Sequence, residues 1–191
     1  MDRLVSLHSL IFGAVERFGD ALLPLLSRLV FAGVLLVYFW KSGLTKLGDG
    51  LLGFIVPSVG AYAQIFPKQL EAVGYDSSQL SIFHWAVVVA GTWAEFILPL
   101  MIVIGLFTRL ASLGMIGFVV VQSLTDLYGH GGIEHVETFG AWFDAAPDSV
   151  IMDQRALWVL VLVTLVIKGA GALSVDRVLQ TLRPSQQPVQ A

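Results

Sequence analysis

The chain has 191 residues, of which 56% are apolar and 13% are charged, and its net charge is −3. Average soluble domains hold about 25% charged residues, so this composition excludes a soluble globular protein and indicates an integral membrane protein. The sequence contains no cysteine, which excludes disulfides, thiolate metal sites and iron–sulfur clusters. The acidic net charge also provides no basic surface for a nucleic acid partner.

Four apolar segments are long enough to cross a bilayer, which takes about 20 helical residues. We place these spans at residues 21–41, 82–104, 109–128 and 156–173. They predict an all-α fold, an integral membrane four-helix bundle that forms a single domain over residues 1–191. The polar, proline-containing residues 184–191 are expected to form a disordered tail.

The basic residues are distributed unevenly between the two ends of the predicted spans. Four spans place both termini on one side, which holds seven basic and four acidic residues. The other side holds four basic and nine acidic residues. Because cytoplasmic segments carry the excess of lysine and arginine, the sequence predicts that both termini are cytoplasmic and that the two long loops lie outside.

These two extended outer loops cover about residues 48–80 and 129–155. Both exceed the roughly two to eight residues that usually connect bundle helices. Residues 51–56 are apolar but too short to span, which is typical of a re-entrant or interfacial segment. Apolar side chains in both loops would otherwise meet water, so we expect the loops to pack over the mouth of the bundle and to dock another protein.

Arg28 and Glu95 are the charges that lie most clearly inside the predicted spans. Counting 1.5 Å per residue from Asp20 and from Gly105 places them roughly 12 and 15 Å deep. Because an isolated charge at the bilayer centre costs at least about 2.5 kcal/mol, the sequence predicts a buried ion pair between the first two spans. Such a pair can fix helix register, relay a proton or hold a quinone or a lipid headgroup; independent snorkelling of the two side chains is the alternative.

A candidate polar cluster at the outer face consists of four further residues: Lys46, His84, Asp126 and His130. His84 and Glu95 are eleven residues apart and therefore share a face of the second span. Asp126 and His130 have the i, i+4 spacing of one helix face. Histidine with carboxylate suits zinc, copper or iron, but no HExxH motif is present, and we expect no metal.

Small residues recur every four positions in the second span, at Ala86, Ala90 and Ala94, with Gly91 beside them. Such spacing lets another helix backbone approach closely. We therefore expect tight helix packing on this face, either inside the bundle or toward a partner protein.

Three segments carry a family resemblance. The first comprises residues 28–33 (RLVFAG) and 40–46 (WKSGLTK), the second residues 94–99 (AEFILP) and 105–111 (GLFTRLA), and the third residues 169–176 (GAGALSVD). Together they resemble the DoxX family of small four-helix bacterial membrane proteins, over roughly residues 25–179. The chain departs from many members in its extended first outer loop and in residues 128–135 (YGHGGIEH).

The resemblance implies a multi-pass bundle in the bacterial inner membrane that is associated with oxidoreductases, including a related quinone-reducing thiosulfate enzyme. The cofactor that the resemblance implies is a quinone. Biochemical roles vary among such proteins, so the resemblance by itself implies no single reaction.

Several functions remain open. The residues offer neither a thiol pair nor a convincing haem or metal site to carry electrons, so a redox role needs a cofactor or partner from elsewhere. We interpret the chain as an accessory subunit or partner of a membrane redox system. In this interpretation the chain places a quinone or lipid near Arg28 and Glu95. Its expected partners are membrane lipids and another membrane or periplasmic protein. The alternatives are a catalytic quinone-reducing subunit and a small transporter or proton pathway. Because the sequence shows no self-contained catalytic site, it leaves open whether the chain is itself an enzyme.

Overall fold

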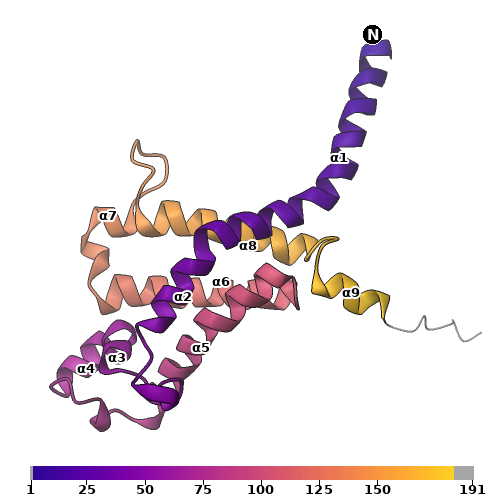
Figure 1. Ribbon diagram of the computed structural model, residues 1–191. Coiled ribbons are helices and arrows are strands. Elements are labelled where there is room, and N and C mark those ends of the chain that lie inside the picture. The colour runs from indigo at the N-terminus through magenta and orange to yellow at the C-terminus, as the bar shows by residue number, and fades with distance from the viewer. Residues whose placement is uncertain (1, 183–191) are drawn as a thin grey trace, which may run out of the picture.

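The computed structural model describes residues 2–182 and consists of helices joined by loops (Figure 1). The helices are α1 (Asp2–Phe31), α2 (Val37–Leu44), α3 (Val59–Ile65), α4 (Pro67–Ala72), α5 (Ile82–Ile104), α6 (Thr108–Leu124), α7 (Val136–Phe139), α8 (Ala156–Lys168) and α9 (Val175–Thr181). No strand occurs within this described range, where the bridge between Leu47 and Pro57 is the isolated β-pairing. The all-α prediction is confirmed, and the predicted tail at 184–191 lies outside the described residues.

Four helical segments are long and apolar enough to cross a membrane: Phe18–Leu44, Ile82–Ile104, Thr108–Gly129 and Val150–Lys168. The predicted number of spans is therefore confirmed. The first span is longer than predicted because a π-helical turn, Ala32–Leu36, joins α1 to α2 without a break. The fourth begins earlier because the charged residues Asp153 and Arg155 lie in a π-helical turn that continues into α8.

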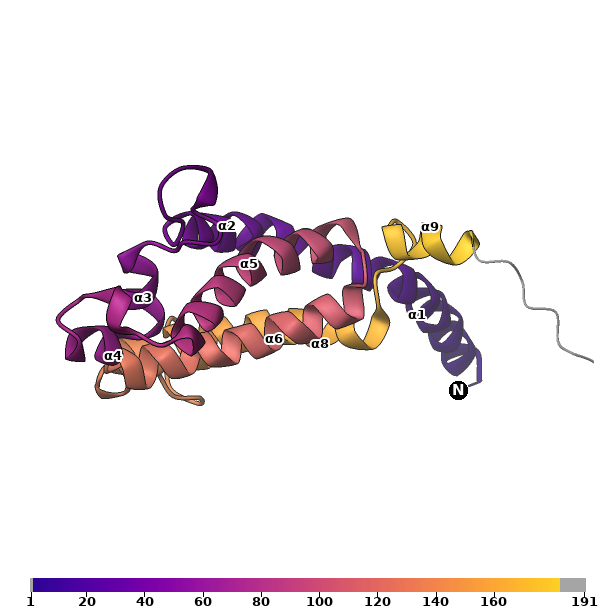
Figure 2. The same ribbon diagram turned by 90° about the horizontal axis from the view of Figure 1, so that it is seen from below.

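The spans surround one hydrophobic core. Helix α6 packs against α5 and α8, while α1 packs against α8 and α2 against α5. The core consists of Phe31, Leu35, Phe39, Ile102, Ala111, Met115, Val119, Leu162 and Leu165. Figure 2 shows α2 and α5 on one side of the bundle and α6 and α8 on the other. Because lipid tails are as apolar as these side chains, close packing rather than water exclusion holds the spans together.

The two ends of the bundle differ, and we name them by what they carry (Figure 1). The capped end carries α3, α4 and α7. The terminal end carries the turn from α5 to α6 and the helix α9. There the N-terminal half of α1 leaves the bundle and exposes apolar side chains such as Val5, Val15 and Phe18.

The first long loop packs against the capped end, as predicted. Ala61, Tyr62 and Leu70 of α3 and α4 form a second apolar cluster with Val88 of α5. Residues 51–56, predicted to be a re-entrant or interfacial segment, lie along α5 and do not enter the bundle. This segment is held there because the indole N–H groups of Trp85 and Trp93 donate to its backbone carbonyls, at 2.8 and 3.1 Å.

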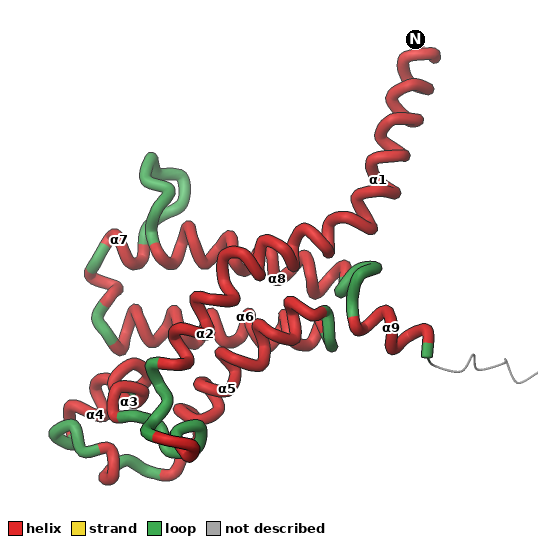
Figure 3. The backbone as a smooth tube through the Cα atoms, viewed as in Figure 1, coloured by secondary structure: helices red, strands yellow, loops and turns green. Residues whose placement is uncertain are grey.

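The second long loop only partly follows the prediction. Trp142 donates its indole N–H to the carbonyl of Met152 at 2.6 Å, which fixes the base of the loop. Its tip, around residues 140–148, projects away from the helices (Figure 3), and Phe143 there is fully exposed. This tip therefore does not cover the mouth of the bundle.

Candidate functional site

Arg28 in α1 is buried at the terminal end and bonds to backbone carbonyls. Its guanidinium donates to Ile102 at 3.0 Å, Val103 at 2.6 Å, Ala170 at 2.9 Å and Leu173 at 2.5 Å. These carbonyls belong to the last turn of α5 and to the segment after α8, so Arg28 links three spans. The predicted ion pair between Arg28 and Glu95 is wrong.

Helix-end chemistry explains this correction. The last carbonyls of a helix have no N–H partner within it, and arginine presents five N–H donors in a planar fork. Arg28 lies level with the last turn of α5, about two helical turns beyond Glu95. The depth estimate failed because α1 continues through Asp20, which therefore does not mark the membrane boundary.

The turn from α5 to α6 is held by the segment that precedes α9. Gly105 has a φ of +72°, and a Cβ there would lie 2.5 Å from the Cβ of Ser174, so this position requires glycine. The Asp176 carboxylate accepts from the backbone N–H groups of Phe107 at 2.6 Å and Thr108 at 2.9 Å. Together with Arg28, these contacts form a structural clamp at the terminal end.

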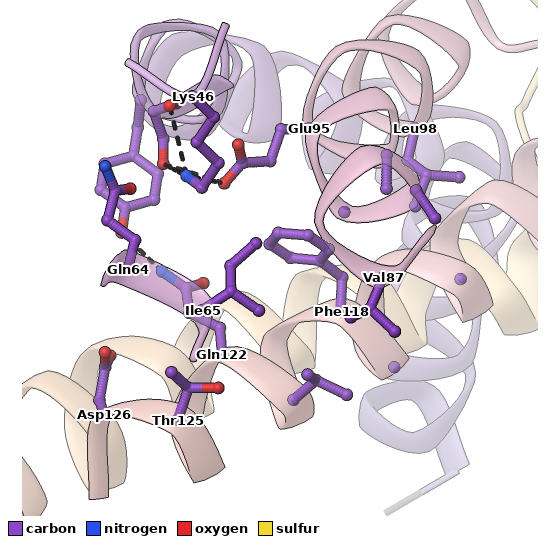
Figure 4. A pocket seen from close by; sticks show the side chains of 18 of the residues that line it. Lys46, Gln64, Ile65, Val87, Glu95, Leu98, Phe118, Gln122, Thr125 and Asp126 are labelled. Carbon is purple, nitrogen blue, oxygen red and sulfur yellow. Dashed lines mark hydrogen bonds and ion pairs between the residues drawn. The ribbon is translucent and has the colours of Figure 1, made fainter. Parts of the chain in front are cut away.

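Glu95 pairs with Lys46 instead of Arg28. Lys46 Nζ lies 3.0 Å from Glu95 Oε1, and the two residues are 5% and 2% exposed. Ser42 donates its hydroxyl to Glu95 Oε1 at 2.9 Å and accepts from Lys46 Nζ at 2.8 Å. Figure 4 shows the Lys46 and Glu95 side chains pointing toward each other. Glu95 Oε2 is buried and has no hydrogen-bond partner in the described part of the chain.

A close approach of α2 and α5 brings this pair together. A Cβ on Gly43 would lie 2.8 Å from carbons of the Phe96 ring, so the missing side chain leaves room for that ring. The carbonyl of Lys46 accepts from the N–H of Ser58 at 3.1 Å, which fixes the backbone just beyond α2. The pairing was missed because the predicted first span ended at residue 41, which put Lys46 outside.

A cavity of about 560 Å³ lies beside the pair, between α2, α5 and α6 (Figure 4). Its volume falls among those of ligand sites, about 300 to 1,000 Å³. Its apolar wall includes Ile65, Val87, Leu98, Phe118 and Val121. Ala90, Gly91 and Ala94, where the sequence predicted close helix packing, line this cavity instead. The face that lacks large side chains therefore provides space for a ligand.

An uncharged polar pair also lines the cavity. Gln122 of α6 donates its side-chain N–H to the hydroxyl of Tyr38 at 2.9 Å. Gln122 Oε1 is buried and has no hydrogen-bond partner among the described residues. The Tyr38 hydroxyl keeps its own hydrogen free for a further acceptor. This pair thus offers one unused acceptor and one donor.

A second ion pair, between Arg155 and Asp126, lines the cavity toward the capped end. Arg155 is buried and also donates to Ser123 Oγ at 3.0 Å, while its Nε has no partner in residues 2–182. Both charged residues lie on π-helical turns, Thr125–Gly129 and Val150–Arg155. Such turns occur frequently at functional sites.

Of the four residues predicted to form the outer polar cluster, three line this cavity: Lys46, Asp126 and His130. His130 Nε2 lies 3.0 Å from the carbonyl oxygen of Gln64. His84 does not join them, because its ring packs against Phe66 and its Nδ1 bonds to Ser81 at 2.9 Å. Within the described range, no three histidine or carboxylate side chains are arranged to hold a metal ion.

The unused polar atoms define what the cavity can bind. Glu95 Oε2 and Gln122 Oε1 are acceptors, whereas Arg155 Nε is a donor. A buried polar group left without a hydrogen bond costs about 1 to 3 kcal/mol. A ligand with an apolar body and hydroxyl groups would satisfy the two acceptors and gain that free energy on binding.

A sequence model of the DoxX family matches residues 23–125, which is more than half of the chain. The chain belongs to the DoxX family. The comparisons with curated proteins and with solved structures gave no match. In this DoxX protein the matched range contains Arg28 of the terminal clamp and both members of the Lys46–Glu95 pair. The closing motif at 169–176 lies beyond that range but supplies carbonyls to Arg28.

Proposed function

We propose that this DoxX protein binds a quinol, the reduced form of a lipid-soluble quinone, in the cavity beside Lys46 and Glu95, and that it serves a membrane redox system as an accessory subunit. One observation carries the proposal: Glu95 lines a mostly apolar cavity, and its buried Oε2 lacks a hydrogen-bond partner in the described part of the chain. A hydrogen bond to a charged group contributes about 1.5 to 3 kcal/mol. A phenolic hydroxyl supplies that bond, whereas a quinone carbonyl does not.

The residues of the cavity bind and orient such a ligand. Lys46 and Ser42 hold Glu95 by its Oε1 and leave Oε2 to accept the hydroxyl. Gln122 Oε1 provides an acceptor for a second hydroxyl. Phe118 and Val121 supply the apolar surface that excludes water from the ring. A bound quinol provides electrons and protons; Glu95 is positioned to hold the proton at its free oxygen.

The electrons require an acceptor outside this chain, which has no cysteine and offers no metal-binding cluster in residues 2–182. We place the docking of a redox protein at the capped end. The exposed aromatic side chains Trp142 and Phe143 support this placement, because aromatic residues are enriched at protein interfaces. The distribution of basic residues supports cytoplasmic termini, so this surface would face the periplasm of a bacterial inner membrane. A reporter fused to the C-terminus tests that orientation.

The binding experiment uses the purified chain in mild detergent, titrated with a short-chain quinol by calorimetry. Gly117 lines the cavity and has open space beside it, so Gly117→Leu fills the cavity without a clash at Cβ. Gly33 is an equally open glycine outside the cavity, and Gly33→Leu is the matched control. We expect saturable binding by wild type and control, and at least roughly tenfold weaker binding by Gly117→Leu. Equal binding by both variants contradicts the proposal.

A proton pathway is the second candidate, and the shared cavity favours it. Glu95, Asp126 and His130 all line that cavity, from mid-span toward the capped end. The test measures proton flux into vesicles that contain the protein but no quinol. A flux that Glu95→Gln abolishes would favour a proton pathway over quinol binding. Turnover of quinol by the purified chain alone would instead identify the chain as the enzyme itself.

A further inference from the structure

A second cavity, of about 580 Å³, lies at the terminal end, away from the proposed quinol site. Its walls come from α1, the start of α6, the end of α8 and α9. Three basic residues line it, one each from α6, α8 and α9: Arg109, Lys168 and Arg177. The two acidic residues in its wall are Asp20 and Asp176.

Both acidic side chains are already engaged. Asp20 pairs with Lys168 at 2.6 Å, and Asp176 caps the first N–H groups of α6. The guanidinium groups of Arg109 and Arg177 have no hydrogen-bond or ion-pair partner within residues 2–182. The cavity therefore has two positive charges that no protein group neutralises.

A buried hydroxyl in the same wall is also unused. Thr108 is 1% exposed and lines the cavity. Its Oγ1 has no hydrogen-bond partner in the described part of the chain. A hydroxyl can donate to an anionic oxygen, so this group adds a neutral donor beside the two arginines.

The cavity lies at the level of lipid headgroups. Thr108 begins the third span and Lys168 ends the fourth. Phe107 and Leu110 line it and are exposed, and the exposed Leu173 lies between the lining residues Ala172 and Ser174. A bound molecule would therefore meet cationic walls inside the cavity and apolar side chains next to the hydrocarbon, which is the arrangement that a diacyl lipid needs.

We propose that this cavity binds the headgroup of an anionic phospholipid. The phosphate oxygens accept charge-assisted hydrogen bonds from Arg109 and Arg177, with Lys168 at the edge and the hydroxyl of Thr108 as a further donor. The apolar side chains at Phe107, Leu110 and Leu173 contact the acyl chains. A free phosphate compound has the same headgroup chemistry but gains nothing from these apolar contacts.

The test measures lipid retention by native mass spectrometry, with the full chain purified from an equimolar mixture of phosphatidylglycerol and phosphatidylcholine. The variant Arg109→Gln/Arg177→Gln removes the two unpaired cations. Lys41→Gln/Lys68→Gln removes two exposed cations outside this cavity and is the matched control. We expect wild type and control to retain phosphatidylglycerol preferentially and the arginine variant to lose about thirtyfold of that preference, since each basic residue near a headgroup contributes about fivefold.

Three outcomes overturn the proposal. An arginine variant that retains the wild-type preference shows that these residues do not select the lipid. Displacement of the lipid by millimolar inorganic phosphate shows a site for soluble phosphate instead. If the arginine variant unfolds at a lower temperature, the charge-preserving Arg109→Lys/Arg177→Lys variant decides the matter: retained preference supports a headgroup site, and lost preference contradicts it.

Discussion

Lys46 Nζ and Glu95 Oε1 lie 3.0 Å apart in a buried contact between α2 and α5, with Ser42 bonded to both. Removing one charge of a buried pair strands the other and costs about 3 to 5 kcal/mol, whereas replacing both by apolar residues is often nearly neutral. We expect Lys46→Met and Glu95→Leu each to lower the thermal unfolding midpoint in detergent, measured by circular dichroism. The double variant should recover most of the loss. A double variant as unstable as the sum of the single variants would show that the contact contributes no coupling.

The sequence predicts this fold well and the partners of its charges poorly. The four spans follow from uninterrupted apolar stretches, whose lengths match the bilayer. Glu95 was correctly singled out because a carboxylate in an apolar span needs a partner. Choosing between Arg28 and Lys46 as that partner requires the offset between α1 and α5 along the bundle. Helix ends set that offset, and charged residues such as Asp20 do not mark them reliably.

The cavity was only partly predictable for a related reason. Lys46, Asp126 and His130 were found as charged or ionisable residues near span ends, and they do line it. Tyr38 and Gln122 were missed, because uncharged polar residues occur in many spans and carry little signal by themselves. Ala90 and Ala94 were noticed as small residues, but small side chains permit either a close helix or an empty space, and only the path of α5 relative to α6 decides which.

Arg28 should matter for folding and not for the proposed ligand. Arg28→Met leaves the carbonyls of Val103, Ala170 and Leu173 without their donor, while that of Ile102 keeps the N–H of Gly105. Each buried unsatisfied group costs about 1 to 3 kcal/mol. We expect a large fall in the unfolding midpoint for Arg28→Met and a smaller one for Arg28→Lys, which keeps the charge but loses the planar fork. Lys41→Met, at an exposed cation, is the control. Wild-type stability of Arg28→Met would contradict the role of the terminal clamp.

Gly43 tests the contact that brings α2 against α5. An alanine Cβ would lie 2.8 Å from the Phe96 ring, and overpacking of this kind costs about 1 to 3 kcal/mol. We expect Gly43→Ala to lower the unfolding midpoint and Gly43→Ala/Phe96→Leu to restore part of it. Gly33→Ala, with no atom within 4 Å of the new Cβ, serves as the control. If Gly43→Ala and Gly33→Ala lower the unfolding midpoint equally, overpacking against Phe96 is not the cause.

The burial of the Tyr62 phenol predicts that the folded protein loses stability at alkaline pH. Burial between α3 and the rest of the capped end raises the pKa of the Tyr62 phenol above its ordinary value. In the unfolded chain the phenol ionises near pH 10, while the folded protein keeps it neutral to higher pH. Its contribution to stability is therefore complete below about pH 10 and is lost as pH rises through the folded pKa. We expect unfolding midpoints to fall across this range in wild type and to fall less in Tyr62→Phe; equal slopes would contradict burial as the cause.

We proposed that Glu95 Oε2 accepts a hydroxyl from a bound quinol. The affinities for a short-chain quinol and for the corresponding quinone test this hydrogen bond directly. Calorimetric titrations would use wild type and the Lys46→Met/Glu95→Leu double variant, in which no charge is stranded. A charged hydrogen bond of about 1.5 to 3 kcal/mol predicts that wild type prefers quinol by roughly ten- to hundredfold. The double variant should keep only the smaller preference that the neutral acceptor Gln122 provides. Equal affinities for the two forms in wild type, or an undiminished preference in the double variant, would contradict Glu95 as the acceptor.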